Sequence, residues 1–81
     1  MKTQQTTRFA ICLKSKSTDD LVVRRIYPVL PDEQAARDNY LRVVDESGED
    51  YLYPASYFFL VELPAKIERV LRRSLPASIA Q

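Results

Sequence analysis

The alternation of apolar and polar residues along the chain predicts five short β-strands. Runs of strand length that are rich in β-branched and aromatic residues and bounded by polar turns are typical of such strands. Five runs have this character: residues 8–14, 21–30, 40–45, 50–54 and 58–63. In the first run both faces are apolar, so we expect both to be at least partly covered. One face carries Phe9, Ile11 and Leu13, and the other carries Ala10 and Cys12.

A change to helical spacing after the last strand predicts a C-terminal helix. Pro64 suits its start, because the first turn of a helix does not use the amide that proline lacks. An apolar stripe at helical spacing follows, formed by Ile67, Val70 and Leu71. Pro76 should end the helix. We expect a helix that docks on the strands through this stripe.

The stretch at residues 40–63, YLRVVDESGEDYLYPASYFFLVEL, organises the predicted fold. Its first two strands are joined by the acidic turn ESGE, where Gly48 supplies the positive φ that tight hairpins need. Pro54 then leads into a short 3₁₀ turn, ASY, before the last strand. The consecutive aromatic residues 57–59 cannot all be internal, so at least one should be exposed.

Prolines also modify the earlier part of the chain. Pro28 lacks an amide donor, and we expect it at a sheet edge, a bulge or a strand break. Residues 31–39 are expected to form a loop with helical character, because Pro31, Asp32 and Glu33 suit the start of a helix.

Five short strands with turn-rich connections predict a mainly β domain, and closure into a barrel would remove exposed strand edges. A chain of 81 residues has room for one core. We therefore expect a five-stranded barrel with a short C-terminal helix. The predicted organisation is a disordered tail at 1–7, a barrel at 8–63, a helix at 64–75 and a tail at 76–81.

Charge is distributed unevenly, although the net charge is only +1. Residues 1–18 carry four basic and no acidic side chains, residues 19–63 carry ten acids against four arginines, and residues 64–81 have a net charge of +3. The favoured interpretation is that the basic ends lie near the acidic barrel surface. The alternative is a nucleic-acid footprint.

The single cysteine, Cys12, excludes an internal disulfide and indicates a reducing compartment. The first residues, MKTQQTT, are polar, and no apolar run reaches transmembrane length. The sequence therefore predicts a cytoplasmic protein that does not enter a membrane.

The order of these features resembles a Src-homology-3 domain across residues 9–63. The tripeptide Asp19-Asp20-Leu21 resembles the acidic loop of that family, YLRVVD stands where the family has its paired tryptophans, and ESGE resembles its distal hairpin. The segment YPASYF resembles the proline, 3₁₀ turn and tyrosine that close the barrel. The resemblance implies five strands in a partly open barrel. The chain is also similar to small uncharacterised bacterial proteins that carry the segment DESGEDYLYP.

The same resemblance implies a ligand groove, from which this chain departs. Tyr40 replaces the groove tryptophan, and the first-strand tyrosines that grip proline-rich ligands fall on Cys12 and Lys14. Because about half of the flat aromatic ridges are missing, conventional proline-motif binding is not favoured. The reduced binding surface would consist of Tyr40, Pro54 and Tyr57, bordered by Asp19 and Asp20.

Alternation in the strand at residues 50–54 leaves two assignments of its faces. Tyr51 and Tyr53 share one face and Leu52 lies on the other. The barrel resemblance places Tyr53 toward the core and Leu52 outward beside Tyr40, as part of the binding surface. The rival assignment buries Leu52 and exposes the tyrosine pair.

Catalytic chemistry has little support in the sequence. The chain has no histidine, which removes the usual general base at neutral pH and the commonest zinc ligand. Cys12 is interpreted as a core thiol rather than a nucleophile. The hairpin acids are interpreted as a solvated tip rather than a calcium or magnesium site; they are Asp45, Glu46, Glu49 and Asp50. No enzyme, cofactor or metal is predicted.

We therefore expect a non-catalytic protein-interaction module that binds another protein. One alternative is a nucleic-acid-binding barrel that uses the basic ends; its residues would be Lys14, Lys16, Arg24, Arg25 and those of the basic helix. Another is a structural protein that self-associates through the helix stripe, as a monomer in equilibrium with a weak homodimer.

Overall fold

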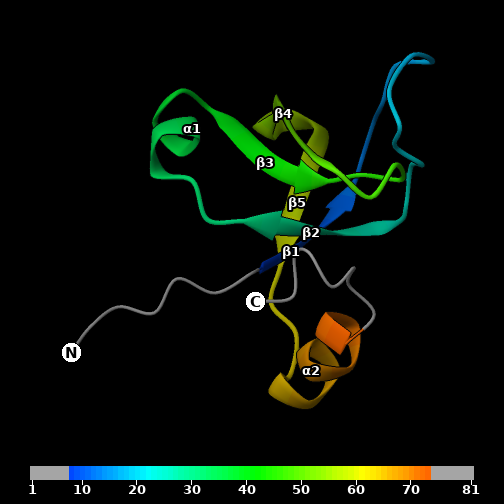
Figure 1. The fold of residues 1–81 in the computed structure, drawn as a ribbon, viewed down its shortest axis with the longest axis vertical. Coiled ribbons are helices and arrows are strands. Elements are labelled where there is room, and N and C mark those ends of the chain that lie inside the picture. Colours follow the sequence, from blue (N-terminus) through cyan, green and yellow to red (C-terminus); the bar gives the residue numbers. More distant parts are fainter. Residues whose placement is uncertain (1–7, 74–81) are drawn as a thin grey trace.

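The computed structural model describes residues 8–73, which form one antiparallel sheet, two helices and one 3₁₀ turn (Figure 1). The strands are β1 (Arg8–Cys12), β2 (Ile26–Leu30), β3 (Tyr40–Val44), β4 (Asp50–Pro54) and β5 (Phe58–Val61). The helices are α1 (Glu33–Arg37) and α2 (Ala65–Arg73), and the 3₁₀ turn is η1 (Ala55–Tyr57). Neighbouring strands follow the order β4-β3-β2-β1-β5.

The sheet is not closed into a barrel, so this part of the predicted fold is wrong. β4 and β5 lie at its two edges, and within residues 8–73 no strand ladder joins them. The rings of Tyr53 and Phe58 meet edge to face instead, with centroids 6.2 Å apart. The two edge strands therefore meet through side chains of the core and not through backbone hydrogen bonds. Figure 1 shows β5 crossing the direction of β2 and β3, so the sheet bends over its own core.

One face of the sheet, the inner face, carries the core. Every strand contributes to it, because alternate residues of a strand point to the same side. Cross-strand pairs such as Val29 with Val43, and Cys12 with Phe58, stand directly opposite each other. The buried cluster consists of Ala10, Cys12, Leu21, Tyr27, Val29, Val43, Tyr53 and Phe58.

The strand predicted at residues 21–30 begins only at Ile26. Arg24 has a φ of 79°, a left-handed conformation that interrupts an extended strand. Pro28 lies within β2, although β2 is an interior strand. The ladder between β2 and β3 begins only at Val29, one residue after the proline that cannot donate to it. Pro28 therefore lies in the middle of an unbroken interior strand that pairs it with Phe9 of β1, and not at the sheet edge, bulge or strand break expected for it.

Residues 31–39, predicted as a loop with helical character, contain α1. The carboxylate of Asp32 caps the helix by accepting the Ala35 N–H at 3.0 Å. Asp32 also pairs with Arg42 of β3, with 2.8 Å between Oδ2 and Nε. The Ala35 amide and the Arg42 guanidinium lower the pKa of Asp32. The cap therefore joins α1 to the sheet.

The hairpin between β3 and β4 forms as predicted. Asp45 N–H donates to the Glu49 carbonyl at 3.1 Å, and Gly48 has a φ of 86°. Tyr53 is 8% exposed and Leu52 is 47% exposed. The structure therefore decides between the two assignments of this strand: Tyr53 faces the core and Leu52 faces outward.

The helix α2 lies beyond the C-terminal end of β5 (Figure 1). None of its residues is buried, and Ile67 and Val70 remain exposed. The expected docking through a buried stripe is therefore not found among the described residues. The predicted tails and the helix end at Pro76 lie outside those residues. Within residues 8–73, no helix is long and apolar enough to cross a membrane.

Truncation of the core valine should measure how much the inner face contributes to stability. Val43 is fully buried, and we expect Val43→Ala to lower the free energy of unfolding by about 2 kcal/mol through lost burial and a residual cavity. Val23→Ala removes the same atoms from an exposed turn and should change it by less than about 0.5 kcal/mol. Urea unfolding followed by circular dichroism compares the two variants; equal losses would contradict the core assignment.

Candidate functional site

The outer face of the sheet, opposite to the core, carries an apolar row across three strands. Ile26 of β2, Ile11 of β1 and Phe59 of β5 stand directly opposite one another in the strand register. Phe59 is 63% exposed and Ile26 is 44% exposed. We call these three residues the outer row. Contiguous apolar side chains left on the surface of a small domain are typical of a contact site.

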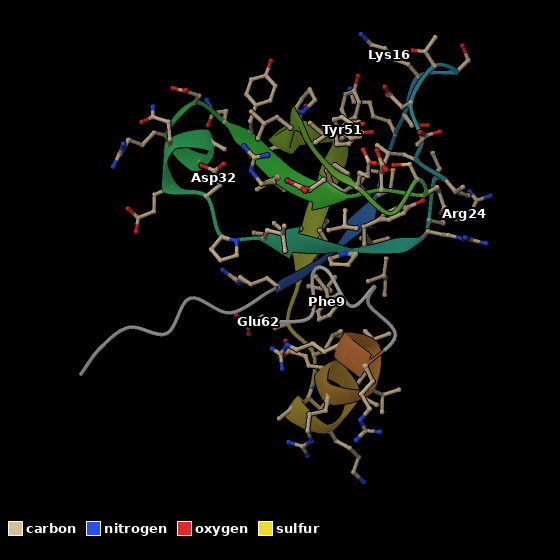
Figure 2. All side chains as sticks on the ribbon, viewed as in Figure 1. Phe9, Lys16, Arg24, Asp32, Tyr51 and Glu62 are labelled. Atoms are coloured by element: carbon tan, nitrogen blue, oxygen red, sulfur yellow. The ribbon has the colours of Figure 1, made fainter. Side chains whose placement is uncertain are left out.

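The helix α2 lies on the same side of the sheet as the outer row. Figure 2 shows Phe9, an outer-face residue of β1, pointing toward the side on which α2 lies. The helix adds the exposed apolar residues Ile67 and Val70 to this side. Its exposed basic residues are Lys66, Arg69 and Arg73. The outer side therefore combines apolar contact area with positive charge.

Three of the sequence-predicted binding residues lie together on the outer face of β3 and β4. Tyr40 stands directly opposite Pro54, and Leu52 precedes Pro54 by two residues on the same face. Tyr40 and Leu52 are exposed, and Pro54 is half-buried. The Ala55 N–H donates to the Asn39 carbonyl at 2.9 Å and holds η1 against the start of β3.

The other three predicted binding residues make contacts of their own within the fold. Tyr57 packs against the core cluster, and the Nζ atom of Lys14 lies 5.7 Å from the centroid of its ring. The carboxylate of Asp19 accepts the Lys16 N–H at 2.9 Å. The Asp20 carbonyl accepts the Glu46 N–H at 2.9 Å, so this loop adjoins the hairpin tip. The tip is at the opposite end of β3 from Tyr40.

A pocket of about 190 Å³ opens at the end of the sheet where β3 begins. Its lining includes Val29, Leu41 and Leu60 from three strands, together with Arg8 and Tyr40. Pockets that enclose small organic ligands usually measure about 300–1,000 Å³. The pocket is therefore too small to indicate a small-molecule site.

The hairpin tip contains a buried carboxylate, that of Asp45. Tyr53 Oη donates to Asp45 Oδ2 at 2.6 Å. The Ser47 N–H and Ser47 Oγ both donate to Asp45 Oδ1, at 2.9 and 2.5 Å. Burial and the neighbouring Asp45 carboxylate raise the pKa of Tyr53 well above its ordinary value. Asp45 is thus a structural acceptor that fixes the tip to the core.

A second carboxylate, that of Glu46, ties the tip to the strand next to β3. Tyr27 Oη donates to Glu46 Oε2 at 2.5 Å and accepts the Val22 N–H at 2.7 Å. Arg25 adds an ion pair with Glu46 at 3.0 Å. Burial, followed by the hydrogen bond to Glu46, raises the pKa of Tyr27 to about 12. The basic turn residue Arg25, one candidate for a phosphate contact, is therefore engaged within the fold.

Neither the cysteine nor the acids form a recognisable reactive centre. Cys12 is fully buried, and burial raises the pKa of its thiol, which disfavours the nucleophilic thiolate. In the described part of the chain, no group of three or more cysteine or acidic side chains could hold a metal ion. The acids of the tip instead accept hydrogen bonds from tyrosine, serine and arginine.

The outer row is not among the binding residues that the sequence predicts. Two signals pointed toward it: both faces of the first strand were apolar, and residues 57–59 could not all be internal. Phe59 is the aromatic residue that the structure exposes most. The alignment of Phe59 with Ile11 and Ile26 depends on the register between distant strands, which local patterns do not specify.

Removal of one phenolic hydroxyl should test the buried carboxylate. Tyr53→Phe leaves Asp45 without its inner donor, and we expect a loss of about 1–3 kcal/mol in the free energy of unfolding. Tyr51→Phe is the matched control, because Tyr51 is half exposed and its hydroxyl donates to Glu49 in a solvent-exposed bond; the substitution should change stability by less than about 0.5 kcal/mol. Urea unfolding near neutral pH measures the free energy of unfolding of both variants. A Tyr53→Phe variant as stable as the wild type would contradict the role of Asp45 as a structural acceptor.

The raised pKa of Tyr27 should make the stability of the domain depend on pH in the alkaline range. An unfolded tyrosine ionises near pH 10, whereas the pKa of folded Tyr27 is about 12. The unfolded state therefore binds fewer protons in this interval, and the free energy of unfolding should fall as pH rises from about 10 to about 12. Urea unfolding at about pH 9 and about pH 11 should show a smaller decline in Tyr27→Phe than in the wild type. An identical decline in both would contradict the assignment.

Comparison with known proteins found no matching family model, no matching curated protein and no matching solved structure.

Proposed function

We propose that this chain is a non-catalytic protein-interaction domain that contacts its partner through the outer row. The observation that carries the proposal is the alignment of Ile26, Ile11 and Phe59 across β2, β1 and β5 on the face opposite to the core. Phe59 has most of its surface exposed. An exposed aromatic residue flanked by β-branched side chains is a typical centre of a binding hot spot.

The charges around the outer row favour a partner with acidic groups at the edge of its contact surface. Arg24 is exposed and lies in the turn that precedes Ile26. The helix α2, which lies on the same side, carries the exposed basic residues Lys66, Arg69 and Arg73. Basic side chains at the rim of an apolar patch steer partners of opposite charge and disfavour partners of like charge.

A relation to the Src-homology-3 family is part of the proposal. The antiparallel order β4-β3-β2-β1-β5 and the 3₁₀ turn between the last two strands support it. The direct pairing of Tyr40 with Pro54 supports it as well. The positions of Tyr57, Asp19 and Asp20 weigh against the family's groove as the contact site, and we place the contact on the outer row instead.

The non-catalytic character is supported by the side chains available. The sequence contains no histidine, and the single cysteine is buried with a raised pKa. The strongly hydrogen-bonded acids, Asp45 and Glu46, are engaged by tyrosines of the fold itself. These groups serve structure rather than general acid or base chemistry.

Partner capture with two matched variants should test the surface. Ile26→Ser removes an exposed apolar side chain from the outer row, and Leu52→Ser removes one of similar exposure from the Tyr40–Pro54 pair. We expect Ile26→Ser to lower the affinity for a saturably bound partner by about 10-fold. Leu52→Ser should bind the same partner with an affinity close to that of the wild type.

Two results of this capture experiment would contradict the proposal. Immobilised wild type and both variants are exposed to cell lysate, and captured proteins are quantified by mass spectrometry after unfolding curves have shown equal stability. Capture that survives Ile26→Ser but is lost in Leu52→Ser would transfer the site to the Tyr40–Pro54 pair. Capture unchanged by both variants would exclude both surfaces.

A further inference from the structure

The edge strand β5 presents backbone hydrogen-bonding groups outward. Opposite residues of an antiparallel pair alternate between hydrogen-bonded and non-hydrogen-bonded pairs. The Leu13 N–H donates to the Tyr57 carbonyl at 2.6 Å, so the bonded pairs between β1 and β5 include Ile11 with Phe59. Leu60 lies between bonded positions, and its N–H and C=O therefore point away from β1. Among residues 8–73, no other backbone segment pairs with this edge.

The two edge strands, β4 and β5, differ in how well they are protected against pairing with a strand of another molecule. By the same alternation, the outward positions of β4 are Asp50, Leu52 and Pro54, since Asp45 N–H bonds the Glu49 carbonyl. Pro54 has no donor, and Asp50 is charged and paired with Arg42. Proline and charge are common devices against edge pairing. β5 reads FFLV, with neither device inside the strand.

We propose that β5 is a self-association edge, at which two copies of this chain pair antiparallel about a two-fold axis at Leu60. In that register the backbone N–H of Leu60 in each copy donates to the backbone carbonyl of Leu60 in the other copy. Phe59 lies opposite Val61 of the second copy, an apolar pair on the outer face. Glu62 lies opposite Phe58, so no like charges face each other.

Self-complementarity favours a second copy over an unrelated strand. A two-fold contact must place each residue against a compatible one of the same segment, and the apolar sequence of β5 satisfies this in the Leu60-centred register. Figure 1 shows α2 beyond the C-terminal end of β5, and no ladder with another strand is found at the outer edge of β5 within residues 8–73. The pairing would join two sheets and bring their outer rows onto one continuous face.

This inference goes beyond the proposed function and does not depend on it, because Ile26 takes no part in the strand pair. Its test uses proline, which is tolerated at outward-facing positions of edge strands. Leu60→Pro removes the outward donor without removing a bond to β1. Leu52→Pro makes the same change at the outward position of β4 and is the matched control.

Sedimentation equilibrium of the full chain over a range of concentrations measures the result. The wild type and Leu52→Pro should show a concentration-dependent dimer, and Leu60→Pro should weaken it by at least about 100-fold, since both copies lose a bond. A wild type that stays monomeric at every concentration would overturn the inference. Equal dimerisation of a folded Leu60→Pro variant would overturn it as well.

A charge-swap pair keeps the inference testable if Leu60→Pro does not fold. At a two-fold axis, Leu60→Lys and Leu60→Glu each place like charges opposite each other, so each variant alone should be monomeric. An equal mixture of the two should recover dimer. A mixture that dimerises no better than its components would show that Leu60 does not face itself.

Discussion

The buried carboxylate of Asp45 is the interaction on which the hairpin and much of the core depend. A buried carboxylate is costly unless its oxygens are hydrogen-bonded. Here Tyr53 donates to one oxygen, and the backbone and hydroxyl of Ser47 donate to the other. Tyr53 thus reaches from β4 to the tip while its ring meets Phe58 of β5. One acid therefore links the tip, the core and both sheet edges.

Glu46 extends this network to the other half of the sheet. It accepts the hydroxyl of Tyr27 from β2, and its backbone N–H bonds the Asp20 carbonyl. Some of the acidic side chains of residues 19–63 are therefore engaged in hydrogen bonds within the fold. This explains why an acid-rich hairpin is better understood as a structural node than as a cation site. It also explains why two tyrosines, rather than a larger apolar cluster, close this end of the core.

The outer row and the open edge of β5 have a common physical cause. A domain of this size buries only about 60–65% of the surface that its unfolded chain exposes. The inner face of the sheet takes up most of the burial, and Ile67 and Val70 of α2 remain exposed. The sheet also ends without closing, since no strand ladder joins β4 to β5 among the described residues. Exposed apolar area and a free edge are what remain for association.

The sequence by itself determined the local structure. Gly48 predicted the hairpin turn, and Pro54 with the residues after it predicted the 3₁₀ turn. Runs of β-branched and aromatic residues predicted five strands, although the second begins only at Ile26, because strand propensity and turn-forming residues act over a few residues. Only the tertiary structure decided what depends on distant contacts. Three features belong to this group: the sheet does not close into a barrel, Asp20 lies apart from Tyr40, and Phe59 aligns with Ile26. Register and sheet curvature arise from packing between strands far apart in the chain, and no local pattern encodes them.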